Sequence, residues 1–164
     1  MTTHNPPIAA FIADTHLSSS GSAWAGSVIR GDAEAAVRFF AEYCAKNKIP
    51  GFGAGDLFDR SLNRSAVLEI ATRALQPFTE SGLTFYYIKG NHDPDSPPWL
   101  TFVSGTHYID NTLVELGNDY AVYGLDYRSA VDLPDALQGI PQEATILLAH
   151  QAWSEWNKNP GAAD

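Results

Sequence analysis

The chain has 164 residues, the length of one domain, and its 45% hydrophobic, 12% aromatic and 18% charged residues exclude a disordered protein. Its net charge of −9 excludes a broad basic surface for long nucleic acid, although it does not exclude nucleic acid in a small site. The single cysteine, Cys44, excludes an intrachain disulfide and indicates a cytoplasmic location, and no apolar run is long enough to span a membrane.

The first half of the chain predicts short strands that alternate with helices. Three apolar runs predict strands over residues 8–13, 51–54 and 83–88. The second of these contains few residues that favour strands. Apolar residues at helical spacing predict helices over residues 32–46 and 65–78.

The second half is mostly strand-like. Turn residues separate three short runs, which predict strands over residues 107–109, 113–116 and 120–125. A short helix over 132–138 and a last buried strand over 145–149 follow. The order strand, helix, strand, helix, strand and then mostly strands predicts one layered α/β domain.

Polar residues able to bind a metal follow four of the predicted strands. They are Asp14 and His16, then Asp56 and Asp59, then Asn91, His92 and Asp93, and finally His150. The carboxyl ends of parallel strands point toward one edge of a sheet, so these side chains meet there if the strands are neighbours. A mixture of carboxylates and imidazoles suits manganese, iron or zinc better than calcium or magnesium alone.

The residue types at these positions also fit a site with two metals. The Asp56 carboxylate has two oxygens and can bridge two cations at the spacing used in two-metal phosphoester hydrolysis. Asn91 offers a carbonyl oxygen that binds a cation without adding charge, and His92 beside it can donate a proton to a leaving oxygen. Each of the first three clusters alone is typical of an ordinary turn, whereas the three clusters together indicate a metal site.

The motifs, in this order and each after a strand, resemble those of the calcineurin-like metallophosphoesterase family. The matching segments are Asp14-Thr15-His16, Gly55-Asp56-Leu57-Phe58-Asp59-Arg60, Gly90-Asn91-His92-Asp93 and, further along, His150. The first two are similar to the branch that contains double-strand-break repair exonucleases and their phage-encoded relatives. The resemblance implies an α/β fold, a layered β-sandwich flanked by helices, formed by a single domain over residues 1–164.

The resemblance further implies two divalent cations, with manganese preferred and iron or zinc as alternatives. Asp14, His16 and the bridging Asp56 would hold the first cation. Asp56, Asn91 and His150 would hold the second.

The remaining site residues take their roles from the same resemblance. His92 would be the catalytic residue that stabilises the phosphoryl transition state or protonates the leaving group. Asp59 would orient His92 through a hydrogen bond. Arg60 would contact the phosphate of the substrate.

The family's closing motif, a later Gly-x-His-x-His-like segment that gives one imidazole to each metal, has no match here. No histidine follows His150. We therefore expect a chain truncated at its C-terminus, which lacks the last strands, binds metal weakly and turns over little substrate. An exposed sheet edge would then favour a homodimer.

Three functions stay open at this point. The residues of the first two motifs favour a phosphodiesterase or nuclease acting on DNA or a nucleotide. The negative net charge of the chain weighs against this function. A phosphomonoesterase acting on proteins or nucleotides is the second. A catalytically inactive phosphoesterase fold used as an interaction module is the third; the absent motif supports it and the retained site residues oppose it.

Overall fold

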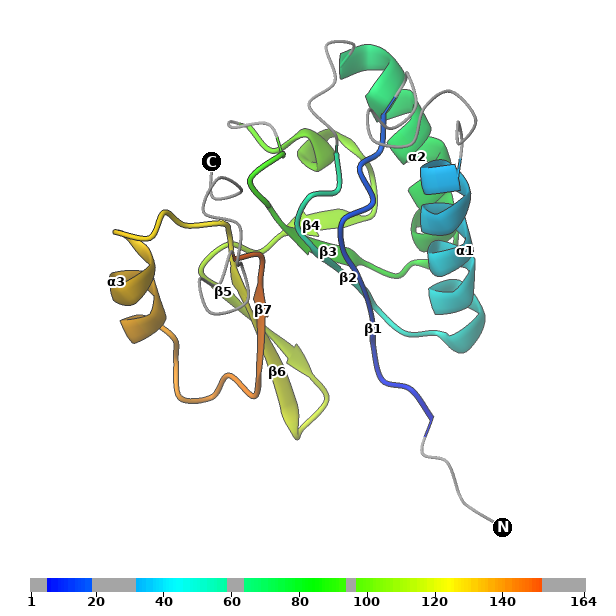
Figure 1. Cartoon of the computed structure of the whole chain (residues 1–164). Coiled ribbons are helices and arrows are strands. Elements are labelled where there is room, and N and C mark those ends of the chain that lie inside the picture. The colour runs from blue at the N-terminus through cyan, green and yellow to red at the C-terminus, as the bar shows by residue number, and fades with distance from the viewer. Residues whose placement is uncertain (1–5, 19–31, 59–63, 94–96, 152–164) are drawn as a thin grey trace.

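The computed structural model describes residues 6–18, 32–58, 64–93 and 97–151. Two β-sheets pack face to face, and two long helices cover the outer face of the first sheet (Figure 1). This arrangement is the α/β layered sandwich flanked by helices that the sequence predicts.

The first sheet is wholly parallel. Its strands lie in chain order: β1 (Ala10–Ile12), β2 (Gly51–Ala54), β3 (Phe85–Ile88) and β4 (Thr106–Tyr108). Chain order and parallel pairing together bring the carboxyl ends of β1, β2 and β3 to the same edge, as the sequence predicts.

Helix α1 (Asp32–Asn47) packs on the first sheet through small side chains. Its buried residues are Val37, Ala41 and Cys44. The helix is confirmed, but its buried face differs in part from the apolar positions in the sequence, because Phe39 is 72% exposed. Burial raises the pKa of the Cys44 thiol to about 11, so this thiol is inert near neutral pH.

Helix α2 (Arg64–Ser81) is longer than predicted and runs through Pro77. The helix continues past this proline because the next residue, Phe78, is fully buried between the helix and the sheet. The hydroxyl of Ser81 then donates a hydrogen bond to the Pro77 carbonyl at 2.6 Å and helps to end the helix.

Strand β2 forms despite its poor strand propensity, because its glycines leave room for aromatic rings. A Cβ at Gly51 would lie 2.5 Å from Cζ of Phe78, and a Cβ at Gly53 would lie 2.7 Å from Cζ of Phe85. The packing of these rings between sheet and helices therefore outweighs the local preference of the chain.

The second sheet and the short helices complete the described chain. Strand β6 (Tyr120–Leu125) lies in the middle, antiparallel to β5 (Thr112–Leu116) and parallel to β7 (Ile146–Ala149). The short helices are η2 (Trp99–Phe102) and α3 (Leu133–Gln138).

The two sheets meet through a buried apolar layer. Its fully or nearly fully buried members are Phe52, Ile88, Ile109, Val122 and Leu148. On this face, Phe52 stacks between the rings of Phe11 and Tyr86, its partners in register on β1 and β3, with centroids 5.2 and 5.1 Å away. This stacking joins β1, β2 and β3 side by side within the first sheet.

Gly124 of β6 packs tightly against Ile109 and Ile88, so we expect Gly124→Ala to lower the free energy of unfolding. A Cβ there would overlap the Ile109 carbonyl oxygen and lie 2.9 Å from Cγ2 of Ile88. Overpacking of this kind costs roughly 1–3 kcal/mol, which urea unfolding followed by fluorescence would measure. Gly139→Ala is the matched control, because its Cβ would meet only the Ala136 oxygen at 3.5 Å; equal effects of the two changes would contradict the prediction.

Candidate metal centre

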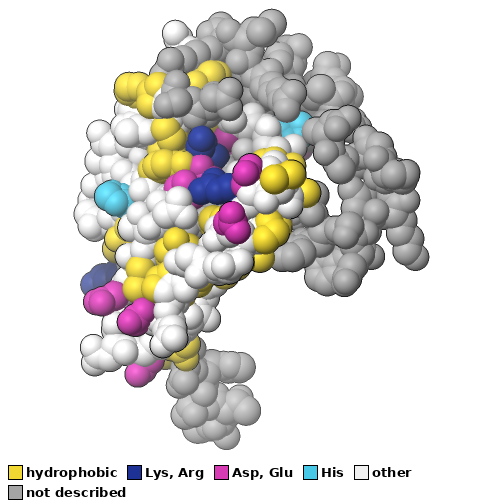
Figure 2. Space-filling model, turned by 90° about the vertical axis from the view of Figure 1, so that its left-hand side faces the viewer, with side chains coloured by type: hydrophobic (Ala, Val, Ile, Leu, Met, Phe, Trp, Pro, Cys, Tyr) yellow, Lys and Arg dark blue, Asp and Glu magenta, His cyan; other side chains and the backbone are white. Residues whose placement is uncertain are grey.

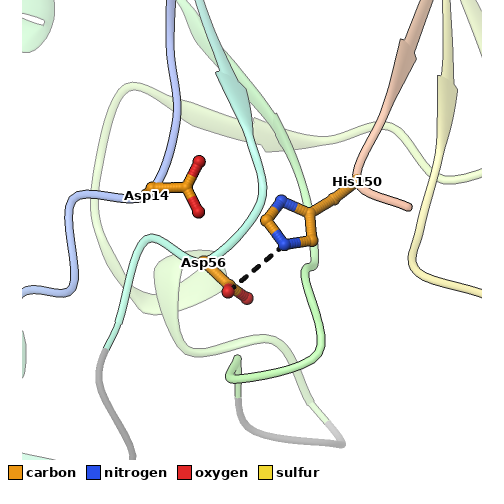
Figure 3. A group of neighbouring side chains, drawn as sticks. All are labelled: Asp14, Asp56 and His150. Atoms are coloured by element: carbon orange, nitrogen blue, oxygen red, sulfur yellow. Dashed lines mark ion pairs between the residues drawn. The ribbon is translucent and has the colours of Figure 1, made fainter. Parts of the chain in front are cut away.

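Three side chains from distant parts of the sequence converge at the carboxyl edge of the sheets (Figure 3). Asp14 follows β1, Asp56 follows β2 and His150 follows β7, and one donor atom of each lies within 4.8 Å of the others. The Asp56 side chain is buried, His150 is partly buried and Asp14 is exposed. A cation could therefore reach the group from solvent on the Asp14 side.

His150 comes from the second sheet. The sequence argument treats the strands before the four polar clusters as neighbours, which holds for β1, β2 and β3 but not for β7. His150 nevertheless reaches Asp56, because the apolar layer around Phe52 and Leu148 packs the two sheets face to face.

Backbone strain is concentrated at this edge. The backbone φ angles of Asp14, His16 and Asp56 are 53°, 45° and 48°. They lie in the left-handed region, which residues other than glycine rarely adopt. The loops after β1 and β2 hold this conformation by pairing with each other: the Asp14 N–H donates to Gly55 O at 3.2 Å and the His16 N–H donates to Asp56 O at 3.1 Å. Strain that the surrounding structure maintains in this way is typical of functional sites.

Two glycines allow the segments to approach. A Cβ at Gly55 would lie 2.7 Å from Cβ of His150 and 2.8 Å from the backbone nitrogen of Gly90. A Cβ at Gly90 would overlap the Asp56 carboxylate. The absence of side chains at these two positions is therefore what lets Asp56 and His150 meet.

Hydrogen bonds orient the imidazole of His150. Its Nδ1 lies 3.0 Å from the Ala54 carbonyl oxygen, which can only accept, so Nδ1 carries the proton that is donated. Its Nε2 lies 3.2 Å from Oδ2 of Asp56. A backbone carbonyl that fixes the tautomer and exposes Nε2 is the usual support of a metal-binding histidine.

The pair Asp56 and His150 shifts the pKa of both groups. Burial acts to raise the pKa of Asp56, but the hydrogen bonds from His150 and from the His92 backbone N–H outweigh it, so the pKa is lowered. The hydrogen bond to Asp56 raises the pKa of His150 and outweighs the opposing effect of burial. Each residue therefore favours the charged form of the other.

The two other predicted histidines of the site lie beside the group. The rings of His16 and His92 meet edge to face with centroids 5.3 Å apart. The His92 backbone N–H donates to Oδ1 of Asp56 at 2.9 Å, which ties the loop after β3 to the site. His107, in contrast, is an exposed residue of β4 whose ring contacts Tyr86.

Asn91 lies between Gly90, which contacts Asp56, and His92, which bonds to it. The structure gives Asp93, the last residue of this motif, a structural role. Its carboxylate accepts from the Phe58 N–H at 2.9 Å and from the Gly90 N–H at 2.8 Å, so it ties the loop after β2 to the loop after β3. Burial raises the pKa of Asp93 despite these two donors.

Two of the predicted site residues, Asp59 and Arg60, lie outside the described residues. Their predicted roles stay predictions.

The donor set fits a divalent cation. Two carboxylates and one imidazole supply oxygen and nitrogen ligands of the kind that borderline divalent metals bind. Because Gly90 has no Cβ, nothing from this residue overlaps the Asp56 carboxylate. A layered α/β fold that presents such a group at the carboxyl ends of its strands has a candidate metal-binding site at the sheet edge.

The comparison with protein families gives the class of protein. The profile described as calcineurin-like phosphoesterase matches residues 9–163, so the chain belongs to this family of metal-dependent phosphoester hydrolases. No curated protein sequence matches the chain significantly. Within the described residues, none of the helices has the length and apolar character needed to cross a bilayer.

In EDTA-treated protein, we expect stability to depend on pH through Asp56 and His150. The pKa of Asp56 is lowered from 3.8, so its contribution is complete above pH 3.8 and is lost as the pH falls through the lowered value. The pKa of His150 is raised from 6.5, so its contribution is complete below pH 6.5 and is lost as the pH rises through the raised value. The free energy of unfolding should therefore fall between about pH 5.5 and about pH 9.

Urea unfolding at both pH values would measure this loss. His150→Gln should reduce it, because glutamine cannot be protonated, whereas His107→Gln should leave it as in the unaltered protein. An unchanged pH dependence in His150→Gln would show that the pair contributes nothing to it.

Proposed function

We propose that this chain is a phosphodiester hydrolase, a phosphodiesterase or nuclease, that works with two divalent cations, preferably manganese. Family membership supports phosphoester hydrolysis. The convergence of Asp14, Asp56 and His150 at one edge of the sheets is the observation that carries the proposal of a metal centre.

The proposed ligands divide into two sets that share Asp56. Asp14, His16 and Asp56 hold one cation, and Asp56, Asn91 and His150 hold the other. The two Asp56 oxygens already have different partners, since Oδ1 accepts from the His92 N–H and Oδ2 lies against His150, which supports a bridging role. Bound cations of this kind polarise the phosphoryl oxygens and lower the pKa of water.

The proposed proton donor is His92. Its backbone is fixed to Asp56, and its ring lies against His16, beside the proposed metal ligands. In this proposal His92 donates a proton to the oxygen that leaves phosphorus, Asp59 orients its ring, and Arg60 contacts the phosphate.

The charge distribution favours a short substrate, such as a nucleotide or a DNA end. Figure 2 shows basic side chains that lie next to acidic ones on one face, with hydrophobic side chains around them. Arg128 pairs with Asp110 at 2.7 Å and Lys89 with Asp126 at 3.5 Å, so these two bases are already neutralised by acids of the same chain. A long polyanion gains little from paired charges.

His150→Ala should lower the affinity for Mn²⁺ at least about tenfold, because it removes a ligand and even the loss of an outer partner costs 10–100-fold. Isothermal titration of Mn²⁺ into EDTA-treated and dialysed protein would measure this. His107→Ala is the matched control, since it removes an imidazole outside the site. Equal Mn²⁺ affinity of His150→Ala and the unaltered protein would contradict the proposed metal centre.

Turnover should be detectable on bis(p-nitrophenyl) phosphate or single-stranded DNA at saturating Mn²⁺, and should vanish with EDTA and in Asp56→Asn. Asp56→Asn provides the baseline, because it removes the charge of the proposed bridging ligand. Turnover of p-nitrophenyl phosphate alone would establish the phosphomonoesterase instead. Metal binding without turnover of either ester would favour the inactive interaction module.

A further inference from the structure

The side chain of Gln151 continues the pairing of β6 and β7 beyond the end of the strands. The ladder between these strands ends at the pair Leu125 and Ala149. Past it, Nε2 of Gln151 donates to the Asp126 carbonyl oxygen at 2.9 Å, and Oε1 of Gln151 accepts from the Arg128 N–H at 3.3 Å. The amide thus occupies the place that a backbone peptide would take in the ladder. His150 is therefore fixed on both sides, by the ladder before it and by Gln151 after it.

The partners of Gln151 are themselves fixed by charged hydrogen bonds. The Asp126 N–H donates to Oδ1 of Asp110 at 2.9 Å. The Arg128 guanidinium donates to both oxygens of Asp110 at 2.7 Å. Charge-assisted hydrogen bonds to one carboxylate are strong and geometrically specific. The backbone from Asp126 to Arg128 is therefore held rigidly and forms the support for Gln151.

The same support is joined to the first sheet. Asp126 is a buried residue, 3% exposed, and its carboxylate accepts from the Lys89 N–H at 2.8 Å and from the hydroxyl of Tyr108. The Tyr127 N–H donates to the Lys89 carbonyl oxygen at 2.9 Å. Lys89 directly precedes the Gly90-Asn91-His92-Asp93 loop, so continuous hydrogen bonding connects that loop to the backbone around His150.

We propose that Gln151 is a positioning residue of the metal centre, which acts through its two hydrogen bonds to the backbone of Asp126 and Arg128 to hold His150 where its imidazole reaches Asp56. The separate origin of His150, in the second sheet, creates the need for such a residue. Asp14 and Asp56 follow adjacent strands and are placed by the first sheet itself, whereas the position of His150 depends on how the end of β7 is held against β6. This inference rests on the proposed function, since it assigns a role toward the same metal.

A double-mutant cycle with Mn²⁺ titration tests the role. The proteins are the unaltered chain, Gln151→Ala, His150→Ala and the double variant, each treated with EDTA and dialysed. We expect Gln151→Ala to lower Mn²⁺ affinity about tenfold, within the range for residues that orient ligands. In the His150→Ala background, Gln151→Ala should cause no further loss, because the ligand it positions is gone. Gln76→Ala, on the exposed face of α2, is the control and should bind as the unaltered chain does.

Two further measurements separate positioning from a general loss of structure. The visible spectrum of bound Co²⁺, which responds to the geometry of imidazole ligands, should change in Gln151→Ala as it does in His150→Ala. Gln151→Glu keeps the acceptor for the Arg128 N–H and loses the donor to Asp126, so a smaller loss of Mn²⁺ affinity is expected. If Gln151→Ala does not fold, the cycle is built with Gln151→Glu.

The outcomes distinguish this inference from the proposed function. Equal affinity losses from Gln151→Ala in both backgrounds would overturn the positioning role, because Gln151 would then act without His150. Unchanged affinity in Gln151→Ala, together with a loss in His150→Ala, would overturn the positioning role and leave the metal centre intact. Unchanged affinity in His150→Ala would overturn the proposed metal centre and this inference with it.

Discussion

The close approach of three backbone segments, at Gly55, Gly90 and His150, is the constraint on which the rest of the site depends. These segments follow β2, β3 and β7, and a single methyl group at either glycine would separate them. The packing of the two sheets through the buried apolar layer around Phe52 and Leu148 brings the end of β7 to the ends of β2 and β3. The donor atoms of the site then converge as a consequence of backbone packing, and their side chains need little freedom to reach one another.

Concentrated negative charge is the cost of this arrangement. Burial is the main cause of the raised pKa of Asp93, and the charge of Asp56 adds to it. Asp14 adds a third carboxylate near Asp56. The His92 N–H, the imidazole of His150 and the N–H groups around Asp93 offset part of this repulsion. A divalent cation is the kind of ligand that would offset more of it, and the net charge of −9 is consistent with a protein that gains from binding cations.

Much of the fold follows from the sequence, because short apolar runs ending in polar motifs determine both the strands and the edge at which their ends meet. Strand β2 was predicted even though glycine disfavours strands, and the structure explains it by the rings that pack on its glycines. What the sequence could not give was the partner of each strand. The placement of β7 in the second sheet depends on contacts between sheets, which leave no local pattern. Gln151 was missed for the same reason, since a lone glutamine after a histidine carries no signal until its two backbone partners are known.

The left-handed backbone at Asp14 and Asp56 also bears on how inactive forms of this protein should be made. Asparagine tolerates that conformation at least as well as aspartate, while alanine does not. An asparagine at either position therefore removes the charge and leaves the chain path in place, whereas an alanine alters both at once. To trap an intact substrate on an inactive protein, asparagine is therefore a better replacement than alanine at these two positions.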